Sequence, residues 1–540
     1  MDPLVLTFDI GTQSLRALLV NKKGETVLSY QLKYEKIKLD STIPGRAEQE
    51  PDFYYDRLCE AGLALKRLAD KQAVEQAAEQ TADKTTEKAN HSADPKDHLF
   101  DRIKAVTITC IRDTVLILDK DCKPLRNIIV WLDERRAPKE IQLPLWKKAL
   151  FGSIGMTEAI HMIYKDGFCN WIMQEEPQLW EKTYKFVVLP SYINYKLTGE
   201  LKDGAANQVG HIPFDYRNRC WMKKGLSRCL ADIPMDKLVD IVPSPGVVGY
   251  INEETSIRCG IPKGLPLIST GTDKACEALG LSVTTEDKAA ISLGTASTIQ
   301  FCSQHYFEPQ PFLPSYPAVM PGFYNGEYQL YRGYWIVTWF IKNFAQEEAA
   351  EAQRRGIKVE AILDEHLEKV PLGAEGLILT PHLAPGNGNP FAKGVLMGLT
   401  DHHNKYHLYR AIIEGIDFEL YHAMLRMQKR SGQQIKQLYI AGGGSVCDTV
   451  VQICADIFGL PIKRIQTHEA SGIGSSLAAF VALGEFKDYE EAVSSMVHDK
   501  DVFTPNEENH KKYMAIYNGV YKHIEKVNTH LFKKLRTCNL

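Results

Sequence analysis

The sequence predicts an α/β protein built from two similar halves. Near its start, the apolar run over residues 4–20 is interrupted by a polar, glycine-containing turn and then resumes, which is typical of two antiparallel strands. The second half repeats this pattern: the apolar run 288–293 enters a Gly-Thr turn and resumes at Thr298. Because both halves open with strand, Gly-Thr turn and strand, we expect an internal duplication.

Charge and composition exclude several classes of function. The 540 residues contain 64 Lys and Arg against 67 Asp and Glu, a net charge of −3, so no excess of positive charge favours a nucleic-acid partner. No apolar run reaches the roughly 18 residues of a membrane-spanning helix, and no leader precedes the first strand, so we expect a cytoplasmic protein without membrane contact. The 12 cysteines form no Cys-x-x-Cys pair, which predicts reduced thiols rather than a zinc or redox site.

The first half is predicted as a mixed α/β domain over residues 1–255. Its segments alternate in hydrophobic period between strand and helix. We expect a third strand at 26–34, a helix at 51–69, strands at 103–109, 115–118 and 128–131, a helix at 164–175, and a strand at 185–189.

An insertion interrupts this domain at residues 70–98. The segment has no aromatic residue, leucine or isoleucine, so it cannot contribute to a core. Its composition up to about Lys88 allows an exposed helix, and a disordered segment is an equal alternative. We expect no catalytic residue there.

The second domain is predicted over residues 256–490. It should contain a strand at 265–270, the strand pair around residue 294, and a strand at 437–441 between helices at 405–430 and 448–458. A helical, polar extension is expected at 491–540.

Two polar turns are candidate phosphate sites. The first contains Gly11, whose missing side chain lets backbone amides approach an anion, with hydroxyls and Arg16 as further donors; Asp9 beside it could hold Mg²⁺, directly or through water. The second is the turn at Gly294 and Thr295. An ordinary hairpin explains either turn alone, but a turn of this kind at the head of each half favours a nucleotide phosphate chain held between the domains.

A third glycine-rich element, Gly442-Gly443-Gly444, follows the strand at 437–441. A strand-to-helix turn needs fewer glycines, so we favour close approach of the backbone to a ligand. By contrast, the glycines at 472 and 474 lack the strand and the third glycine of a dinucleotide fingerprint, and we interpret them as close helix packing.

In this order, these elements resemble the FGGY carbohydrate-kinase family of the actin-like (ribonuclease H-like) ATPase superfamily. The most specific match is Gly-Val-Leu-Met-Gly-Leu at 394–399, followed after seven residues by His-Leu-Tyr-Arg-Ala-Ile-Ile-Glu at 407–414. The resemblance extends from Asp9 to about Met496 and is poorer near Trp171, where Phe168 replaces the family's lysine. It implies two actin-like domains with a cleft between them, and phosphorylation of a sugar or polyol by ATP with Mg²⁺.

The resemblance also implies a role for each motif residue. The catalytic aspartate falls on Asp273, at the end of a predicted strand, where a carboxylate can accept the proton of the attacking hydroxyl. The alternative is that Asp273 only caps the helix that follows. The ATP phosphates and adenosine are assigned to Gly11, Thr12, Gln13, Ser14, Arg16, Gly294, Thr295, Gly442, Gly443 and Gly444, with Asp9 toward Mg²⁺.

The acceptor is assigned to Arg112, Asp113 and Trp131, which are similar to the Arg-Glu and Trp segments of glycerol kinases. Vicinal hydroxyls need donors and acceptors, and an indole face covers the C–H side of a polyol. A surface ion pair and a core Trp are the alternative. Lys274 replaces the glutamine that glycerol kinases carry after the catalytic aspartate, so it is a candidate for reading an anionic acceptor or else a solvated helix residue.

The predicted function is ATP-dependent phosphorylation of a hydroxyl of a small sugar, ketose or polyol. One alternative is a glycerol kinase proper. The second is a non-kinase actin-like ATPase or binding module, which would have no need of a polyol pocket. The sequence leaves open which hydroxyl reacts and the oligomeric state, for which a homodimer is one candidate.

Overall fold

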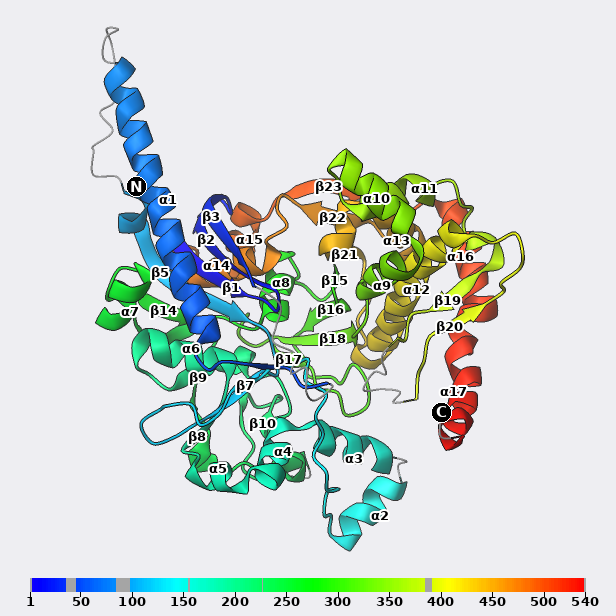
Figure 1. Ribbon diagram of the computed structural model, residues 1–540, viewed down its shortest axis with the longest axis horizontal. Coiled ribbons are helices and arrows are strands. Elements are labelled where there is room, and N and C mark those ends of the chain that lie inside the picture. Colours follow the sequence, from blue (N-terminus) through cyan, green and yellow to red (C-terminus); the bar gives the residue numbers. More distant parts are fainter. Residues whose placement is uncertain are drawn as a thin grey trace. The chain divides into compact units, whose positions relative to one another are not determined.

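The computed structural model describes residues 2–34, 45–83, 98–153, 156–225, 227–383 and 391–538. The chain divides into two compact units, each folded around its own sheet (Figure 1). The first unit comprises Met1–Gly280, Tyr316–Gly322 and Glu469–Val497, and the second comprises Leu281–Ser315, Phe323–His468 and His498–Leu540.

A six-stranded mixed sheet forms the centre of the first unit. Strand β1 (Leu4–Ile10) is buried along its whole length, pairs antiparallel with β2 (Ser14–Asn21), and pairs parallel with β5 (Ile103–Cys110). The full order is β13 (Gly246–Tyr250), β14 (Pro266–Ser269), β5, β1, β2, β3 (Thr26–Lys33). Because β1, β5 and β14 are parallel, their carboxyl ends lie at one edge of the sheet.

The second unit repeats this topology. Six strands of its sheet follow the order β18 (Tyr324–Leu330), β16 (Ser297–Ser303), β15 (Lys288–Leu293), β21 (Gln437–Ala441), β22 (Ile462–Ile465), β23 (Asp499–Phe503). In this order, β18, β16 and β15 are antiparallel neighbours, β15, β21 and β22 are parallel neighbours, and β23 is an antiparallel edge strand. The first sheet, followed from β3 to β13, has the same sequence of pairings. The predicted duplication is therefore present in the strand pairing.

The units divide the chain elsewhere than the predicted boundaries at 255 and 490. Residues 256–280 belong to the first unit, because β14 completes its sheet beside β5. Helix α14 (Ala470–Ala482) also belongs to it, since Ser476 Oγ lies 2.7 Å from Thr7 Oγ1 of β1. The interpretation of the glycines in α14 as packing residues is confirmed: a Cβ on Gly474 would lie 1.9 Å from the Cys276 carbonyl oxygen.

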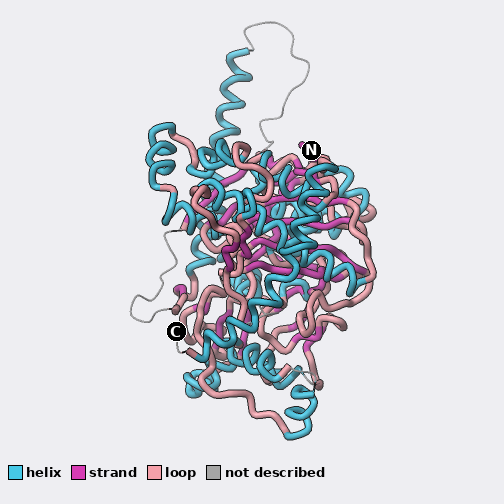
Figure 2. The backbone as a smooth tube through the Cα atoms, turned by 90° about the vertical axis from the view of Figure 1, so that its right-hand side faces the viewer, coloured by secondary structure: helices cyan, strands magenta, loops and turns pink. Residues whose placement is uncertain are grey.

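The helix predicted at 51–69 is longer than expected. Helix α1 (Phe53–Asp83) packs its first turns on β2 and β3 and then continues beyond the sheet, as Figure 1 and Figure 2 show. Part of the insertion at 70–98 is therefore helical. Residues 84–97 of that insertion lie outside the described part of the chain.

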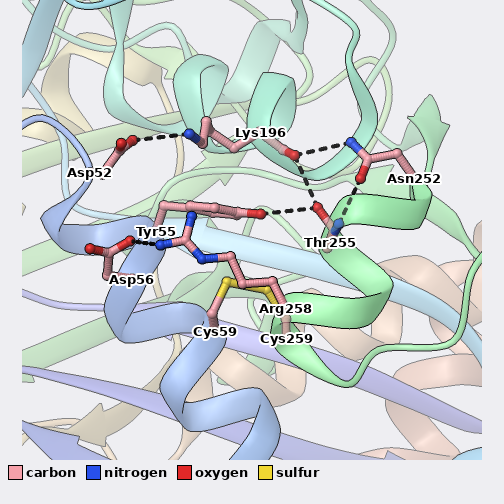
Figure 3. Close-up of a disulfide and its surroundings, with 9 residues drawn as sticks. All are labelled: Asp52, Tyr55, Asp56, Cys59, Lys196, Asn252, Thr255, Arg258 and Cys259. Atoms are coloured by element: carbon pink, nitrogen blue, oxygen red, sulfur yellow. Dashed lines mark hydrogen bonds and ion pairs between the residues drawn. A yellow bond between two sulfur atoms is a disulfide. The ribbon is translucent and has the colours of Figure 1, made fainter.

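The prediction of reduced thiols is wrong for one pair. Cys59 of α1 and Cys259 of α7 (Glu253–Cys259) form a disulfide (Figure 3). Both cysteines are buried, and Arg258 beside them pairs with Asp56 at 2.7 Å from Nη2 to Oδ1. Two buried thiols from segments that are distant in sequence became neighbours through packing, which no Cys spacing could reveal.

The remaining elements flank the two sheets. In the first unit, the helix predicted at 164–175 is broken at Gly167, because the Asn170 side chain donates to the Tyr164 carbonyl in place of a helical hydrogen bond. The other first-unit elements are α2 (Leu145–Ser153), α3 (Thr157–Asp166), α4 (Phe168–Glu175), α5 (Pro177–Lys182), α6 (Leu189–Thr198), α8 (Asp273–Gly280), α15 (Tyr489–Met496), the sheet β4 (Glu48–Gln49), β7 (Ile128–Ile129), β6 (Val115–Leu118), β8 (Lys185–Val188), and the short strands β9 (Lys202–Gly204), β10 (Phe214–Asp215), β11 (Cys220–Trp221), β12 (Asp240–Val242) and β17 (Tyr316–Pro317).

The second unit contains a long helix, α12 (Lys405–Ser431), and further helices that precede and follow it in the sequence. They are α9 (Trp335–Phe344), α10 (Gln346–Arg355), α11 (Val359–Leu367), α13 (Asp448–Phe458), α16 (Glu507–Ile516) and α17 (Lys522–Thr537), with the strand pair β19 (Ile378–Thr380) and β20 (Val395–Met397). No helix in the described ranges is both long and apolar enough to cross a bilayer.

Candidate active site

The carboxyl edge of the first sheet gathers three of the predicted motifs. The turn at Gly11 follows β1, Arg112 and Asp113 follow β5, and Asp273 follows β14. These strands are parallel neighbours, so their following loops meet at the same edge. This is the edge at which open α/β sheets bind their ligands.

Asp9 and Arg16 face each other across the β1–β2 pair. The register pairs their Cα atoms, and Arg16 Nη1 lies 3.6 Å from Asp9 Oδ2, while Arg16 Nε lies 3.2 Å from Glu469 Oε1. The turn closes with a hydrogen bond from Gly11 N to Ser14 O of 3.0 Å. Burial raises the pKa of Asp9 to about 7; Arg16 lowers it in part, and Asp273 and Glu469 raise it further.

Asp273 is the first residue of α8 and is half-buried where this helix follows β14. Burial raises its pKa, while Arg112 and Lys274 act in the opposite direction. The capping interaction expected for a helix start comes from Thr272, whose hydroxyl lies 3.4 Å from Ala275 N. The Asp273 carboxylate accepts from the adjacent Lys274 N at 2.8 Å, whereas the hydroxyl that reaches a later N–H of this helix is that of Thr272.

Lys274 is already engaged by a carboxylate. Its Nζ lies 2.6 Å from Glu277 Oε2, one turn further along α8, and both side chains are largely buried. The positive charge of Lys274 is therefore compensated within the helix. Sequence reasoning did not single out Glu277, although its spacing of three residues from Lys274 is the ordinary signal of an ion pair on a helix.

The acceptor candidates contact their surroundings through different groups. The guanidinium carbon Cζ of Arg112 lies 5.9 Å from the centroid of the Tyr316 ring. Trp131 donates from Nε1 to Thr12 Oγ1 at 3.0 Å, which connects this indole to the first turn. Trp131 is half-buried and also packs against the core of the first unit. Asp113 takes a different partner, His211, at 2.8 Å.

A buried carboxylate, Asp203, organises the segment that carries His211. It accepts hydrogen bonds from five donors, at Ser191, Asn194, Gly204, Asn207 and Gln208. Burial raises its pKa to about 6, and the donors lower it in part. Neither residue was predicted from the sequence. His211 meets Asp113 across 98 positions, and the donors around Asp203, although within 12 positions, follow no recognised motif.

The second unit carries the other two glycine motifs at the corresponding edge of its own sheet. The turn at Gly294 and Thr295 joins β15 to β16, and its carbonyls accept from Tyr334 N at 3.0 Å and Trp335 N at 3.3 Å. The glycine-rich turn follows β21, the parallel neighbour of β15. Both motifs therefore lie side by side within this unit.

The three consecutive glycines differ in whether the surrounding structure requires the absence of a side chain. Gly442 has φ of 93°, and a Cβ there would lie 2.7 Å from the Leu293 backbone. A Cβ on Gly444 would lie 2.5 Å from the Tyr334 ring. A Cβ on Gly443 would meet nothing within 4 Å, so packing does not require glycine at this position. Open space beside Gly443 is what a ligand contacting the backbone needs.

A Mg²⁺ ion at this edge of the first sheet would need additional oxygen ligands from the phosphates of the bound nucleotide. Among the described residues, no group of three or more His, Cys, Asp or Glu side chains is placed to hold a metal by itself. Mg²⁺ is commonly bound by one or two carboxylates together with substrate phosphates and water. The buried carboxylate of Asp9 fits that type of site.

The match to known families is consistent with the duplicated topology. The profile of the N-terminal domain of the FGGY family of carbohydrate kinases matches residues 4–280, and that of its C-terminal domain matches residues 289–483. The chain belongs to the FGGY family of carbohydrate kinases. It is accordingly a phosphotransferase that uses ATP to phosphorylate a sugar, and the predicted family and fold class are confirmed.

Individual FGGY relatives cover this chain to different extents. The uncharacterized sugar kinase YgcE of Escherichia coli (strain K12) is 30% identical over 347 residues, 64% of this chain and 70% of the relative. The xylulose kinase of Bacillus subtilis (strain 168) is 26% identical over 548 residues, 98% of each chain. The structure of ligand-bound xylulose kinase from Lactobacillus acidophilus matches with a TM-score of 0.78 and 21% identity, covering 99% of this chain and 100% of that one.

Proposed function

We propose that this FGGY kinase phosphorylates a hydroxyl of a small sugar, ketose or polyol, with Asp273 accepting the proton of the attacking oxygen. One observation carries the proposal: half-buried Asp273, whose pKa is raised by desolvation, follows β14, and Arg112 and Asp113 follow β5, the parallel neighbour of that strand. A base in this position lies next to a donor and an acceptor suited to adjacent hydroxyls.

In this proposal, the nucleotide is held by the glycine motifs of both units. The turn at residues 11–16 and the turn at Gly294 and Thr295 would bind phosphates through backbone amides and hydroxyls, and open Gly443 would contact the adenosine. Asp9 would hold Mg²⁺, directly or through water. The bound Mg²⁺ and ATP supply the phosphoryl group and neutralise its charge, while the protein contributes positioning and a proton acceptor. That these turns bind the same nucleotide stays a prediction. The assembly of the protein into a homodimer is a separate prediction.

The Lys274–Glu277 pair favours a neutral acceptor over an anionic one. A lysine already compensated by a carboxylate at 2.6 Å attracts an additional anion weakly. A polyol or ketose therefore fits this site better than a sugar acid. Glycerol itself remains the alternative substrate; its kinases carry glutamine at the position of Lys274.

A coupled ADP-release screen tests the proposal. The protein is incubated with ATP and Mg²⁺ and with single polyols, ketoses and sugar acids, and Asp273→Asn serves as the variant without the base. ADP release that depends on an added neutral sugar and is lost in the variant supports the proposal. A sugar acid as the preferred acceptor would contradict the role inferred for the Lys274–Glu277 pair.

A further inference from the structure

A histidine that lies far from Asp113 in sequence is in direct contact with the Asp113 carboxylate. His211 Nδ1 lies 2.8 Å from Asp113 Oδ2, and the His211 backbone N–H donates to Asp113 Oδ1 at 3.2 Å. The Asp113 backbone N–H in turn donates to the Val209 carbonyl, also at 3.2 Å. Three contacts therefore join the end of β5 to residues 209–211.

The local backbone is built for this contact. Asp113 has φ of 46°, a left-handed conformation that non-glycine residues adopt rarely and mostly where surrounding structure enforces it. Gly210 has φ of 152°, and a Cβ there would lie 2.4 Å from Asp113 Oδ1. The Tyr216 hydroxyl donates to the Gly210 carbonyl at 3.2 Å. The absence of a side chain at Gly210 therefore lets the Asp113 carboxylate approach this loop, and the Tyr216 hydroxyl holds the loop through its hydrogen bond to the Gly210 carbonyl.

The charges of the pair support each other. Burial alone would raise the pKa of Asp113 and lower that of His211, yet their mutual attraction reverses both: the pKa of Asp113 is lowered and that of His211 is raised. The other charged groups acting on the pair are Arg112, which lowers the pKa of Asp113, and Asp166, which raises that of His211. At neutral pH the carboxylate is therefore ionised and accepts hydrogen bonds only.

We propose that His211 is a positioning residue for the sugar: it orients the Asp113 carboxylate so that the remaining lone pairs of that carboxylate accept hydrogen bonds from substrate hydroxyls. The inference rests on the proposed role of Asp113 in binding the acceptor. Each carboxylate oxygen accepts one bond from His211 and keeps further acceptor capacity. Without the imidazole, the carboxylate could rotate or turn toward Arg112, and the hydroxyls would lose a fixed partner.

The test compares variants of His211 in steady-state kinetics with a neutral sugar identified by the ADP-release screen. His211→Leu removes both the hydrogen-bond donor and the charge of the imidazole. The KM for the acceptor should then rise roughly 10- to 100-fold, which is the effect expected for loss of a charged hydrogen bond. The KM for ATP should be unchanged, and kcat should stay within a few fold of wild type. His211→Asn offers an amide nitrogen near the position of Nδ1 and should recover most of the affinity. Thermal melting verifies that each variant folds.

The pH profile separates positioning from general structural support. Because Asp113 raises the pKa of His211, the imidazole keeps its proton to higher pH than an isolated histidine, and the acceptor KM of the wild type should increase as that proton is lost with rising pH. In His211→Asn this increase should be absent. His161→Asn, which breaks another histidine–carboxylate pair, with Glu140 at 3.2 Å, is the matched control and should keep the wild-type profile.

The outcomes distinguish this inference from the proposed function. An acceptor KM in His211→Leu within twofold of wild type, or a pH profile in His211→Asn that still rises, overturns the role of His211. If Asp113→Asn raises the acceptor KM while His211→Leu does not, only the inference fails. If Asp113→Asn also leaves the KM unchanged while sugar phosphorylation persists, the acceptor assignment of Asp113 fails and the inference with it.

Discussion

Replacing Asp9 with asparagine should stabilise the protein while impairing catalysis. The carboxylate is buried, and its pKa is raised from 3.8 to about 7, because burial outweighs the attraction of Arg16. At about 1.4 kcal/mol per pH unit, keeping this group ionised at pH 8 costs the fold about 4 kcal/mol. An amide has nearly the same shape and carries no charge, so the variant avoids most of this cost.

The sign of the pH dependence follows from the raised pKa. Below pH 3.8 the carboxyl is protonated in both the folded and the unfolded protein, and the variant has no advantage. The advantage grows as pH rises toward about 7, where folded wild type also ionises, and is constant above it. At pH 8 the melting transition of the variant should be higher by on the order of 5–10 °C.

Calorimetric melting of wild type and Asp9→Asn from pH 4 to pH 8 measures this difference in stability. In the same variant, ATP-dependent turnover should fall by roughly 10- to 100-fold if Asp9 supports the metal. Asp203→Asn is the contrasting control. Asp203 is also buried, but an amide there would place an NH2 donor against at least two of the five groups that donate to this carboxylate, so this variant should melt at a lower temperature. An Asp9→Asn variant that is no more stable than wild type at pH 8, or whose advantage does not change with pH, would refute the argument.

Four further variants test other parts of the site and fold. Asp273→Asn should lower kcat by roughly 10² to 10⁴ with ATP affinity nearly unchanged, measured by turnover and calorimetry; near wild-type turnover would remove Asp273 from the mechanism. Gly443→Val should weaken ATP binding without affecting melting, because the space there is open, whereas Gly444→Val should lower the melting temperature by displacing Tyr334; intact ATP affinity in folded Gly443→Val would mean that the ligand does not approach this turn. Cys59→Ser should lower the melting temperature and make it insensitive to reductant, since the disulfide closes a loop of 200 residues; a wild type whose melting does not respond to reductant would exclude a stabilising disulfide.

Much of the fold could be predicted from local patterns. The hairpin at residues 4–20, the strands that end before Arg112 and Asp273, and the helix at 448–458 follow from hydrophobic period, which depends only on near neighbours in the chain. The repeated Gly-Thr turn disclosed the duplication for the same reason. Motif spacing then determined the family, and with it the reaction class.

The tertiary structure decided what depends on contacts between distant segments. Helix α14 returns to the first unit, and Cys59 meets Cys259, because packing brought together residues that no local pattern relates. His211 became relevant only when its loop was found against Asp113, 98 positions away. Local pattern specifies which residues form each strand and turn, whereas the partners of a buried charge are chosen by the whole fold, because an unpaired charge in the interior is costly wherever its partner lies in the sequence.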